Sequence, residues 1–469
     1  MAYLLLPISL FIKTFNISTT LYYVVQLPVY LYSLIAVYAF FSQSKNNYRR
    51  LMKDSFNKRV ISCLLITLGL QIVALSWSYF SLIGNDFNRN PINEFVKLII
   101  VILCIISHYC VVKFVVSDEK SIMKFLQGTG IALVILLVIS YIQFLYLLFP
   151  NIFSKAVEIL GSFEYRYKRD WYSAGSYVQT ESRINGLNPE SDYLAVQYLV
   201  IFVPFILASI KNKFNFFSEK IKYHPSLYYL LLVSIIVILF FAKTSTGILA
   251  IGMIMFSLWL IVPLREKIIF AVLISIALVT IYIAAIHSPM IMEILNITLF
   301  TKLGGDSMLN RTGGTLGLIF TWLRHPIFGV GFNYHDYYLF KFVPKWTMTS
   351  YEFRSVFAPE RTYPILSAIF GWLAEFGAIF VAFISVYVYR LLKDFRRISN
   401  FVQSVNISER EKQMINALKD SVYYFFFFYL ICSLLIFNWY ESIYMITLFF
   451  FVVVRQYLKK RFNIEESYR

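Results

Sequence analysis

Apolar runs alternate along the chain with short connections, many of them rich in lysine and arginine. A helix needs about 20 mostly apolar residues to cross the hydrocarbon of a bilayer. Eleven runs approach that length: 20–41, 60–83, 95–116, 125–149, 191–210, 226–243, 244–262, 268–287, 364–390, 421–437 and 442–458. A shorter stretch, from Met1 to about Phe15, makes twelve if it also crosses. The pattern therefore predicts an all-α polytopic membrane protein with about 11 or 12 transmembrane helices.

Composition supports this class. Hydrophobic residues make up 59% of the chain and charged residues 15%, whereas soluble domains carry about 25% charged residues. The net charge of +17 would suit a nucleic-acid partner. However, most basic residues lie in the short connections, as the positive-inside rule requires. We therefore expect no nucleic acid among the partners and take the bilayer itself as the first partner.

The basic connections also predict the orientation. Lysines and arginines crowd the connections 42–59, 211–225, 263–267 and 391–420, and they follow the last span. Alternating the spans places all of these groups on one side, which is then cytoplasmic. Two long polar stretches, about 150–190 and 288–363, fall on the opposite side. The predicted organisation is a transmembrane bundle over 1–287, a large external loop over 288–363 and C-terminal spans over 364–469.

Both external stretches are themselves basic, which favours an anionic ligand at the outer surface. Guanidinium groups bind phosphate in a bidentate manner and stay charged in a partly dry site. Headgroup contact or simple solvation is the alternative interpretation for each external arginine. Lys243 lies in an external hairpin almost without a loop, where it either reaches the headgroups or points into a cavity. The candidate anion-binding residues are Arg183, Arg311 and Lys243.

Glu375 falls inside an apolar span. A carboxylate there costs about 2.5–3.5 kcal/mol on insertion scales, so it indicates function or a structural ion pair within the bundle. Gly329-Val-Gly331 lacks the third glycine and preceding strand of a dinucleotide site. The segment Pro326–Gly331 instead predicts a helix end, after a short surface helix over Gly314–Leu323. Asp306, His325, His335 and Asp336 lack metal-ligand spacing, so no metal is expected.

Four local motifs carry a family resemblance. They are Arg183-Ile-Asn-Gly186 followed by Asn188-Pro189, then Arg311, then Pro326–Gly331, and finally Ala374-Glu-Phe-Gly377. Their order and their places in the predicted topology resemble the O-antigen polymerase and O-antigen ligase superfamily of bacterial envelope glycosyltransferases. Ligases of this superfamily usually carry a His-Asn pair before the span that follows the large loop. Residues 359–364 contain no histidine. The ligase-like hairpin often has an arginine where this chain has Thr246, and both departures favour a polymerase.

The resemblance implies a GT-C-like fold in the bacterial inner membrane, an active site on the periplasmic face, and no cofactor. The substrates would be undecaprenyl-pyrophosphate-linked glycans, polymerised in O-antigen lipopolysaccharide biosynthesis, with a chain-length regulator as a further partner. Arg183 and Arg311 would stabilise the leaving pyrophosphate. The general base stays open among His335, Asp336 and Glu360. The remaining substrate contacts would come from Lys243, Arg324, Arg361 and Glu375. The alternatives are a ligase that transfers glycan to lipid A core or another acceptor and, from a different class, a lipid-linked oligosaccharide flippase.

Overall fold

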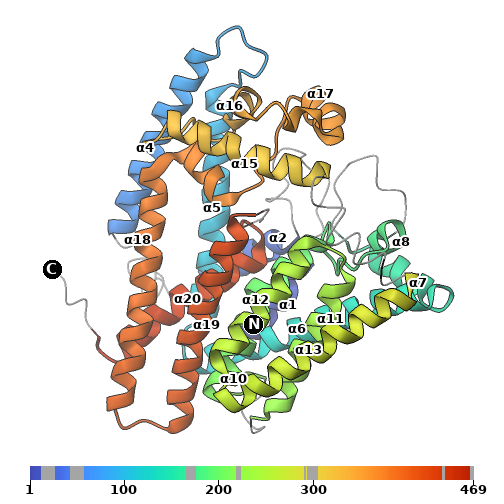
Figure 1. Ribbon diagram of the computed structural model, residues 1–469. Helices are drawn as coiled ribbons and strands as arrows, with labels where there is room; N and C mark the ends of the chain where they lie inside the picture. The colour runs from blue at the N-terminus through green and yellow to red at the C-terminus, as the bar shows by residue number, and fades with distance from the viewer. Residues whose placement is uncertain are drawn as a thin grey trace.

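The computed structural model describes residues 1–11, 27–42, 58–164, 176–217, 223–289, 292, 305–435 and 439–464. Every regular element in these ranges is helical and none is a strand (Figure 1). A described helix lies at each of the eleven predicted spans. The spans correspond to α2 (Leu27–Ser42), α4 (Lys58–Ser81), α5 (Pro91–Val115), α6 (Glu119–Leu148), α9 to α10 (Ser191–Asn212), α11 (Pro225–Phe241), α12 (Ser245–Ile261), α13 (Leu264–His287), α18 (Ala368–Ser404), α19 (Glu409–Ser433) and α20 (Ser442–Arg461).

Six of these helices are both long and apolar enough to cross a membrane: α4, α5, α6, the helix from α9 to α10, α18 and α20. The protein is therefore an all-α, multi-pass membrane protein. The predicted total of eleven or twelve spans stays a prediction. The possible first span begins with the short helices η1 (Ala2–Leu4) and α1 (Leu5–Ser9), and its remainder, residues 12–15, lies outside the described residues.

Local sequence signals set several helix ends. Asn90 accepts a hydrogen bond from the Ile92 amide at the start of α5, where Pro91 occupies the first helical position. Asp118 and Ser121 form a capping box at the start of α6. Proline is tolerated in the first turn, and such caps satisfy amides that lack a partner within the helix. The boundaries of these two spans thus follow from their own residues.

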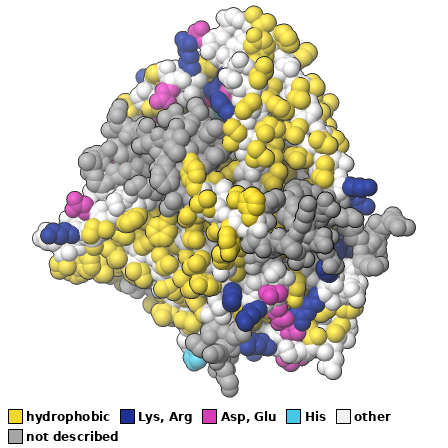
Figure 2. Space-filling model, turned by 180° about the vertical axis from the view of Figure 1, so that it is seen from behind, with side chains coloured by type: hydrophobic (Ala, Val, Ile, Leu, Met, Phe, Trp, Pro, Cys, Tyr) yellow, Lys and Arg dark blue, Asp and Glu magenta, His cyan; other side chains and the backbone are white. Residues whose placement is uncertain are grey.

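The main core lies where α6, α10, α19 and α20 meet. Helix α10 packs on α19, α20 packs on α5, and α2 also packs on α5. Aromatic rings fill much of the space between them, for example Phe125 and Phe450, which stack with centroids 3.9 Å apart. On the outside, hydrophobic side chains cover much of the surface while charged side chains gather near its edges (Figure 2). Both features are expected of helices surrounded by lipid.

Residues 305–363, which we call the loop layer, lie across one end of the long helices (Figure 1). This layer contains α15 (Asp306–Arg324), α16 (His335–Phe342), η4 (Thr347–Thr349), η5 (Phe353–Phe357) and α17 (Ala358–Glu360). Helix α15 packs against both α16 and α18. It begins eight residues before the predicted surface helix, so Arg311 lies within its second turn. Its end at Arg324 agrees with the helix end predicted at Pro326–Gly331.

The other predicted external stretch, 150–190, is also partly helical. Helix α7 (Pro150–Gly161) and helix α8 (Tyr177–Glu181) belong to it. Residues 165–175 of this stretch lie outside the described residues, as do 290–291 and 293–304 of the larger one.

Candidate functional site

Helix α18 is broken at Gly377, whose backbone angles are φ 76° and ψ 178°. The break frees backbone groups, and the segment after α15 pairs with them. The amides of Val330 and Gly331 donate to the carbonyls of Ala374 and Glu375, at 2.8 and 3.0 Å. The Ala378 amide donates to the Pro326 carbonyl at 2.8 Å. Buried backbone groups need such partners, so the loop segment completes the broken helix.

Glycine is required on both sides of this contact. A Cβ atom at Gly377 would lie 2.2 Å from the Ile327 carbonyl oxygen, and one at Gly329 would lie 2.5 Å from Glu375 backbone atoms. Both glycines also have positive φ, which other residues rarely adopt. The two glycine-containing motifs that the sequence analysis singled out, Pro326–Gly331 and Ala374–Gly377, therefore contact each other.

Glu375 lies directly at the break and is buried. Its Oε1 atom accepts hydrogen bonds from the Asn333 amide at 2.8 Å and from Nδ1 of His335 at 2.7 Å. Its backbone carbonyl also accepts from the side chain of Gln71 in α4, at 3.0 Å. From the sequence, Glu375 could have formed a structural ion pair with a lysine or arginine of the bundle. In the structure its carboxylate instead pairs with a histidine of the loop layer.

His335 is held between two carboxylates. Its Nε2 atom lies 3.5 Å from Oδ1 of Asp336, and Asp336 also accepts from the Tyr363 amide at 2.8 Å and pairs with Arg89. Burial lowers the pKa of His335, while Asp336 and Glu375 raise it and Arg89 opposes them. The net result is a pKa above the ordinary histidine value. The ring therefore stays protonated to a higher pH than an exposed histidine.

Arg311 forms the second charged part of the site. Its Nη2 atom lies 2.6 Å from Oδ2 of Asp192 at the start of α9. Burial lowers the pKa of Arg311, but Asp192 more than reverses this effect, so the group stays cationic. The Nε atom is buried and has no hydrogen-bond partner within the described ranges. The Nε–H group of Arg311 can therefore donate a hydrogen bond to an acceptor on a bound ligand.

Arg183 lies half-buried in the loop before α9. The side chain of Gln143 in α6 holds this loop, because its amide oxygen accepts from the backbone amides of Asn185 and Gly186, at 3.2 and 2.8 Å. Tyr177, in the nearby helix α8, is influenced by the charges of this region. Burial, Glu190 and Asp192 raise its pKa, and Arg183 lowers it. Arg183 and the acidic turn that pairs with Arg311 thus both act on Tyr177, and the Asn-Gly part of the Arg183 motif is held by Gln143.

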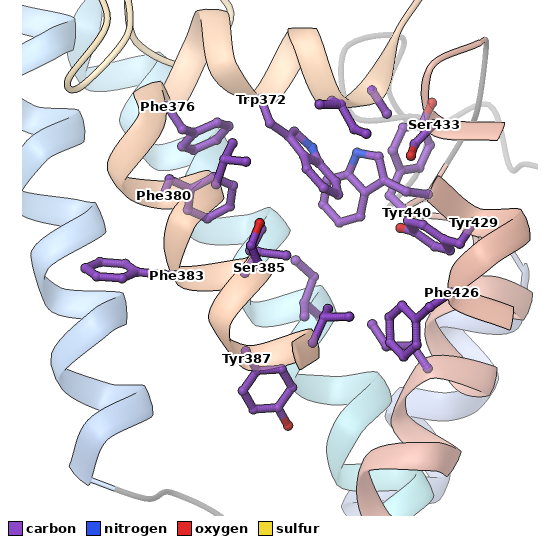
Figure 3. A pocket seen from close by; sticks show the side chains of 18 of the residues that line it. Trp372, Phe376, Phe380, Phe383, Ser385, Tyr387, Phe426, Tyr429, Ser433 and Tyr440 are labelled. Atoms are coloured by element: carbon purple, nitrogen blue, oxygen red, sulfur yellow. The ribbon is translucent and has the colours of Figure 1, made fainter. Parts of the chain in front are cut away.

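A large cavity connects part of this site to the membrane-spanning helices. Its volume is about 2930 Å³, and Arg311, His335 and Glu375 line one end. From there it follows α18 and α19, with α4, α5 and α20 also contributing walls. Figure 3 shows the aromatic character of this wall, which includes Trp372, Phe380, Phe426 and Tyr429. The cavity therefore combines a polar, charged end with a long apolar wall.

The other six predicted site residues, which include Asp336 described above, are not among those that line this cavity. Arg183 is described above. Lys243 is half-buried at the turn between α11 and α12, with φ 52°. Arg324 is exposed at the end of α15, 4.9 Å from the centroid of the Phe342 ring. Arg361 is exposed and pairs with Asp86 at 2.9 Å, and Glu360 is exposed next to it.

Several residues that shape the site were not predicted from the sequence. Arg89 pairs with Asp336, and Gln71 donates to the Glu375 carbonyl and accepts from the Phe332 amide at 2.9 Å. Glu94, buried in the first turn of α5, accepts from the Asn333 side chain at 2.7 Å. A polar residue within an apolar span is itself a functional signal, so Gln71 was detectable. Asp192 offered no comparable signal.

The described residues contain no group of three or more His, Cys, Asp or Glu side chains arranged to hold a metal ion. Comparison with protein-family models, with curated proteins and with solved structures finds no match to this chain.

Proposed function

We propose that this protein is a glycosyltransferase that polymerises oligosaccharide repeat units carried on undecaprenyl pyrophosphate, at the periplasmic face of the bacterial inner membrane. One observation carries the proposal. The His335–Glu375 pair and Arg311 line one end of a cavity whose apolar wall continues along membrane-spanning helices. A lipid-linked pyrophosphate needs both environments, because its chain is apolar and its leaving group is anionic.

In this proposal Arg311 stabilises the leaving group. Charge develops on the pyrophosphate as the bond to the anomeric carbon breaks, and fixed cations aimed at developing charge are effective catalysts. The ion pair with Asp192 orients the guanidinium, and Nε remains available as a donor. Arg183 assists from the loop before α9, where its charge and that of Asp192 both act on Tyr177.

His335 acts as the general base. Its Nδ1–H donates to Glu375 in the tautomer that this contact favours, which leaves Nε2 to accept a proton. The acceptor sugar hydroxyl loses its proton to Nε2, and its oxygen bonds to the anomeric carbon of the donor. As this bond forms, the bond between that carbon and the pyrophosphate oxygen breaks, and undecaprenyl pyrophosphate departs with the bonding electrons. Glu375 is a positioning residue, because it contacts His335 and holds the imidazole.

The polymerase is favoured over a ligase by the sequence departures at 359–364 and Thr246. It is favoured over a flippase because Arg311 and His335 belong to the loop layer, and Asp192, which pairs with Arg311, lies in the first turn of α9. A transporter would need such groups along a path through the bundle.

Deletion of the gene separates these functions, with the surface glycans examined by gel electrophoresis. We expect a single repeat unit on the lipid A core, restored to long polymer by the wild-type gene. Unattached long polymer on the carrier lipid would identify a ligase instead. Loss of all repeat units, with lipid-linked material accumulating inside the cell, would identify a flippase and overturn the proposal.

A further inference from the structure

The other end of the same cavity differs sharply in charge. Basic side chains from four helices line it. Three of these side chains lie at the ends of α4 and α5: Lys58, Arg59 and Lys113. Six more come from α18 and α20: Arg390, Lys393, Arg397, Arg455, Lys459 and Lys460. Among the cavity-lining residues at this end, Asp394 is the one carboxylate. We call this region the basic end of the cavity.

The basic end lies near the membrane surface opposite the loop layer. Ala378 follows the break in α18, and Asp394 lies further along the same helix. Asp394 lies 16 residues after Ala378, which corresponds to a rise of about 24 Å at 1.5 Å per residue. This length is close to the roughly 30 Å thickness of the hydrocarbon core. By the positive-inside rule, the basic end faces the cytoplasm.

Asp394 neutralises only part of this charge. It pairs with Lys459 at 3.4 Å and lies 3.8 Å from Arg455. The Arg455 side chain also lies over the Tyr387 ring, 5.3 Å from its centroid. Its Nε atom is buried and has no hydrogen-bond partner in the described part of the chain. The geometry therefore leaves a buried donor at a site where basic side chains outnumber carboxylates among the described cavity-lining residues.

We propose that the basic end binds the headgroup of an anionic phospholipid from the cytoplasmic leaflet, with its acyl chains running along the apolar wall. Basic pockets between transmembrane helices on the cytoplasmic side suit such headgroups. The phosphate accepts from Arg455 and interacts with the lysines around it. The wall beyond it is apolar and aromatic, including Phe383 and Phe426 (Figure 3). This site is independent of the transferase chemistry at the loop layer.

The positive-inside rule by itself also places basic residues on the cytoplasmic side of a membrane protein. The test therefore needs a control variant that removes the same number of charges. Arg390→Gln with Lys460→Gln removes two exposed charges that line the cavity. Arg396→Gln with Lys124→Gln removes one arginine and one lysine that are exposed on helices at the same side and do not line it. Both double variants lower the net charge equally. They differ in whether the removed charges face the cavity.

Binding is measured on the purified full-length protein by native mass spectrometry. The probes are phosphatidylglycerol and phosphatidylcholine with identical acyl chains. The wild type is expected to prefer phosphatidylglycerol. Each basic residue near a membrane surface contributes about 1 kcal/mol to such attraction, so the cavity variant should bind phosphatidylglycerol roughly 30-fold more weakly. The control variant should bind it like the wild type.

Three results would overturn the proposal. Equal binding of the two lipids by the wild type would show that the groove binds acyl chains without recognising the headgroup. This measurement uses only the wild-type protein, so it does not require that a variant folds correctly. Equal losses in both double variants would show that general surface charge determines binding, and no loss in either would show that the charges at the basic end do not contribute.

Discussion

Nδ1 of His335 lies 2.7 Å from Oε1 of Glu375. This pair joins the start of α16 in the loop layer to the break in α18. The Asn333 amide donates to the same carboxylate oxygen, and Gln71 bonds the backbone on both sides of the contact. The imidazole is therefore oriented by groups on three separate elements. Such support is what a catalytic histidine needs to keep one tautomer and one ring position.

Replacing Glu375 by glutamine should change the pH dependence of polymerisation. Glu375 raises the pKa of His335, and the base must be neutral to accept a proton. The wild-type rate should therefore rise with pH through a midpoint above the ordinary histidine value of about 6.5. In Glu375→Gln the raising charge is lost, so the midpoint should move to lower pH. The measurement is the pH–rate profile of purified protein on lipid-linked repeat units, and an unchanged midpoint would remove Glu375 as a positioning residue.

The identity of the base can be tested by a pair of variants. His335→Gln should reduce elongation by about 10²–10⁴-fold, the usual contribution of general base catalysis. Glu360→Gln serves as the control, because Glu360 is exposed and does not line the cavity. It should elongate like the wild type. The opposite result in the same elongation assay would make Glu360 the base.

Arg311→Gln should reduce elongation by at least about 10²-fold, because it removes a cation from the proposed leaving-group site. Arg311→Lys should recover little activity, since lysine cannot reproduce the planar guanidinium contact with Asp192 and a phosphate together. Arg324→Gln is the matched control, because Arg324 is exposed and lies outside the cavity lining. Polymer length on a gel, normalised to protein level, reports all three variants. Equal effects of Arg311→Gln and Arg324→Gln would remove the specific role of Arg311.

A further test concerns Arg183, which contributes to the same proposed clamp. Arg183→Ala should abolish chain elongation while leaving the protein level intact. Wild-type polymer lengths in this variant would restrict the clamp to Arg311.

The break in α18 should be intolerant of any side chain at Gly377. Its φ of 76° and the approach of the Ile327 carbonyl leave no room for a Cβ atom, and the backbone strain alone costs about 1–3 kcal/mol. Gly377→Ala should therefore lower the melting temperature in detergent. Gly252→Ala in α12 is the control, because nothing lies within 4 Å of its would-be Cβ. A Gly377→Ala protein as stable as this control would show that the break is not constrained as described.

Much of the fold follows directly from the amino-acid sequence. A bilayer core offers no water to unpaired backbone groups, so a long apolar run must form a helix there. Helices consequently lie at all eleven predicted spans. The cost of an intramembrane carboxylate likewise marked Glu375 before its partner was known. The segment Pro326–Gly331 indicated the helix end that follows α15, whereas the break at Gly377, inside the predicted span 364–390, was not predicted.

Only the tertiary structure decided which polar groups meet. His335 and Glu375 are separated by 40 residues, and Asp192 and Arg311 by 119. When a helix is apolar on all sides, its sequence pattern does not show which face points into the bundle. The sequence of a loop likewise does not show which distant residues the loop contacts. The sequence therefore left the base open among His335, Asp336 and Glu360. Packing of the loop layer against the broken helix placed His335 on the cavity wall and Glu360 on the surface, because the backbone groups freed at Gly377 had to be satisfied there.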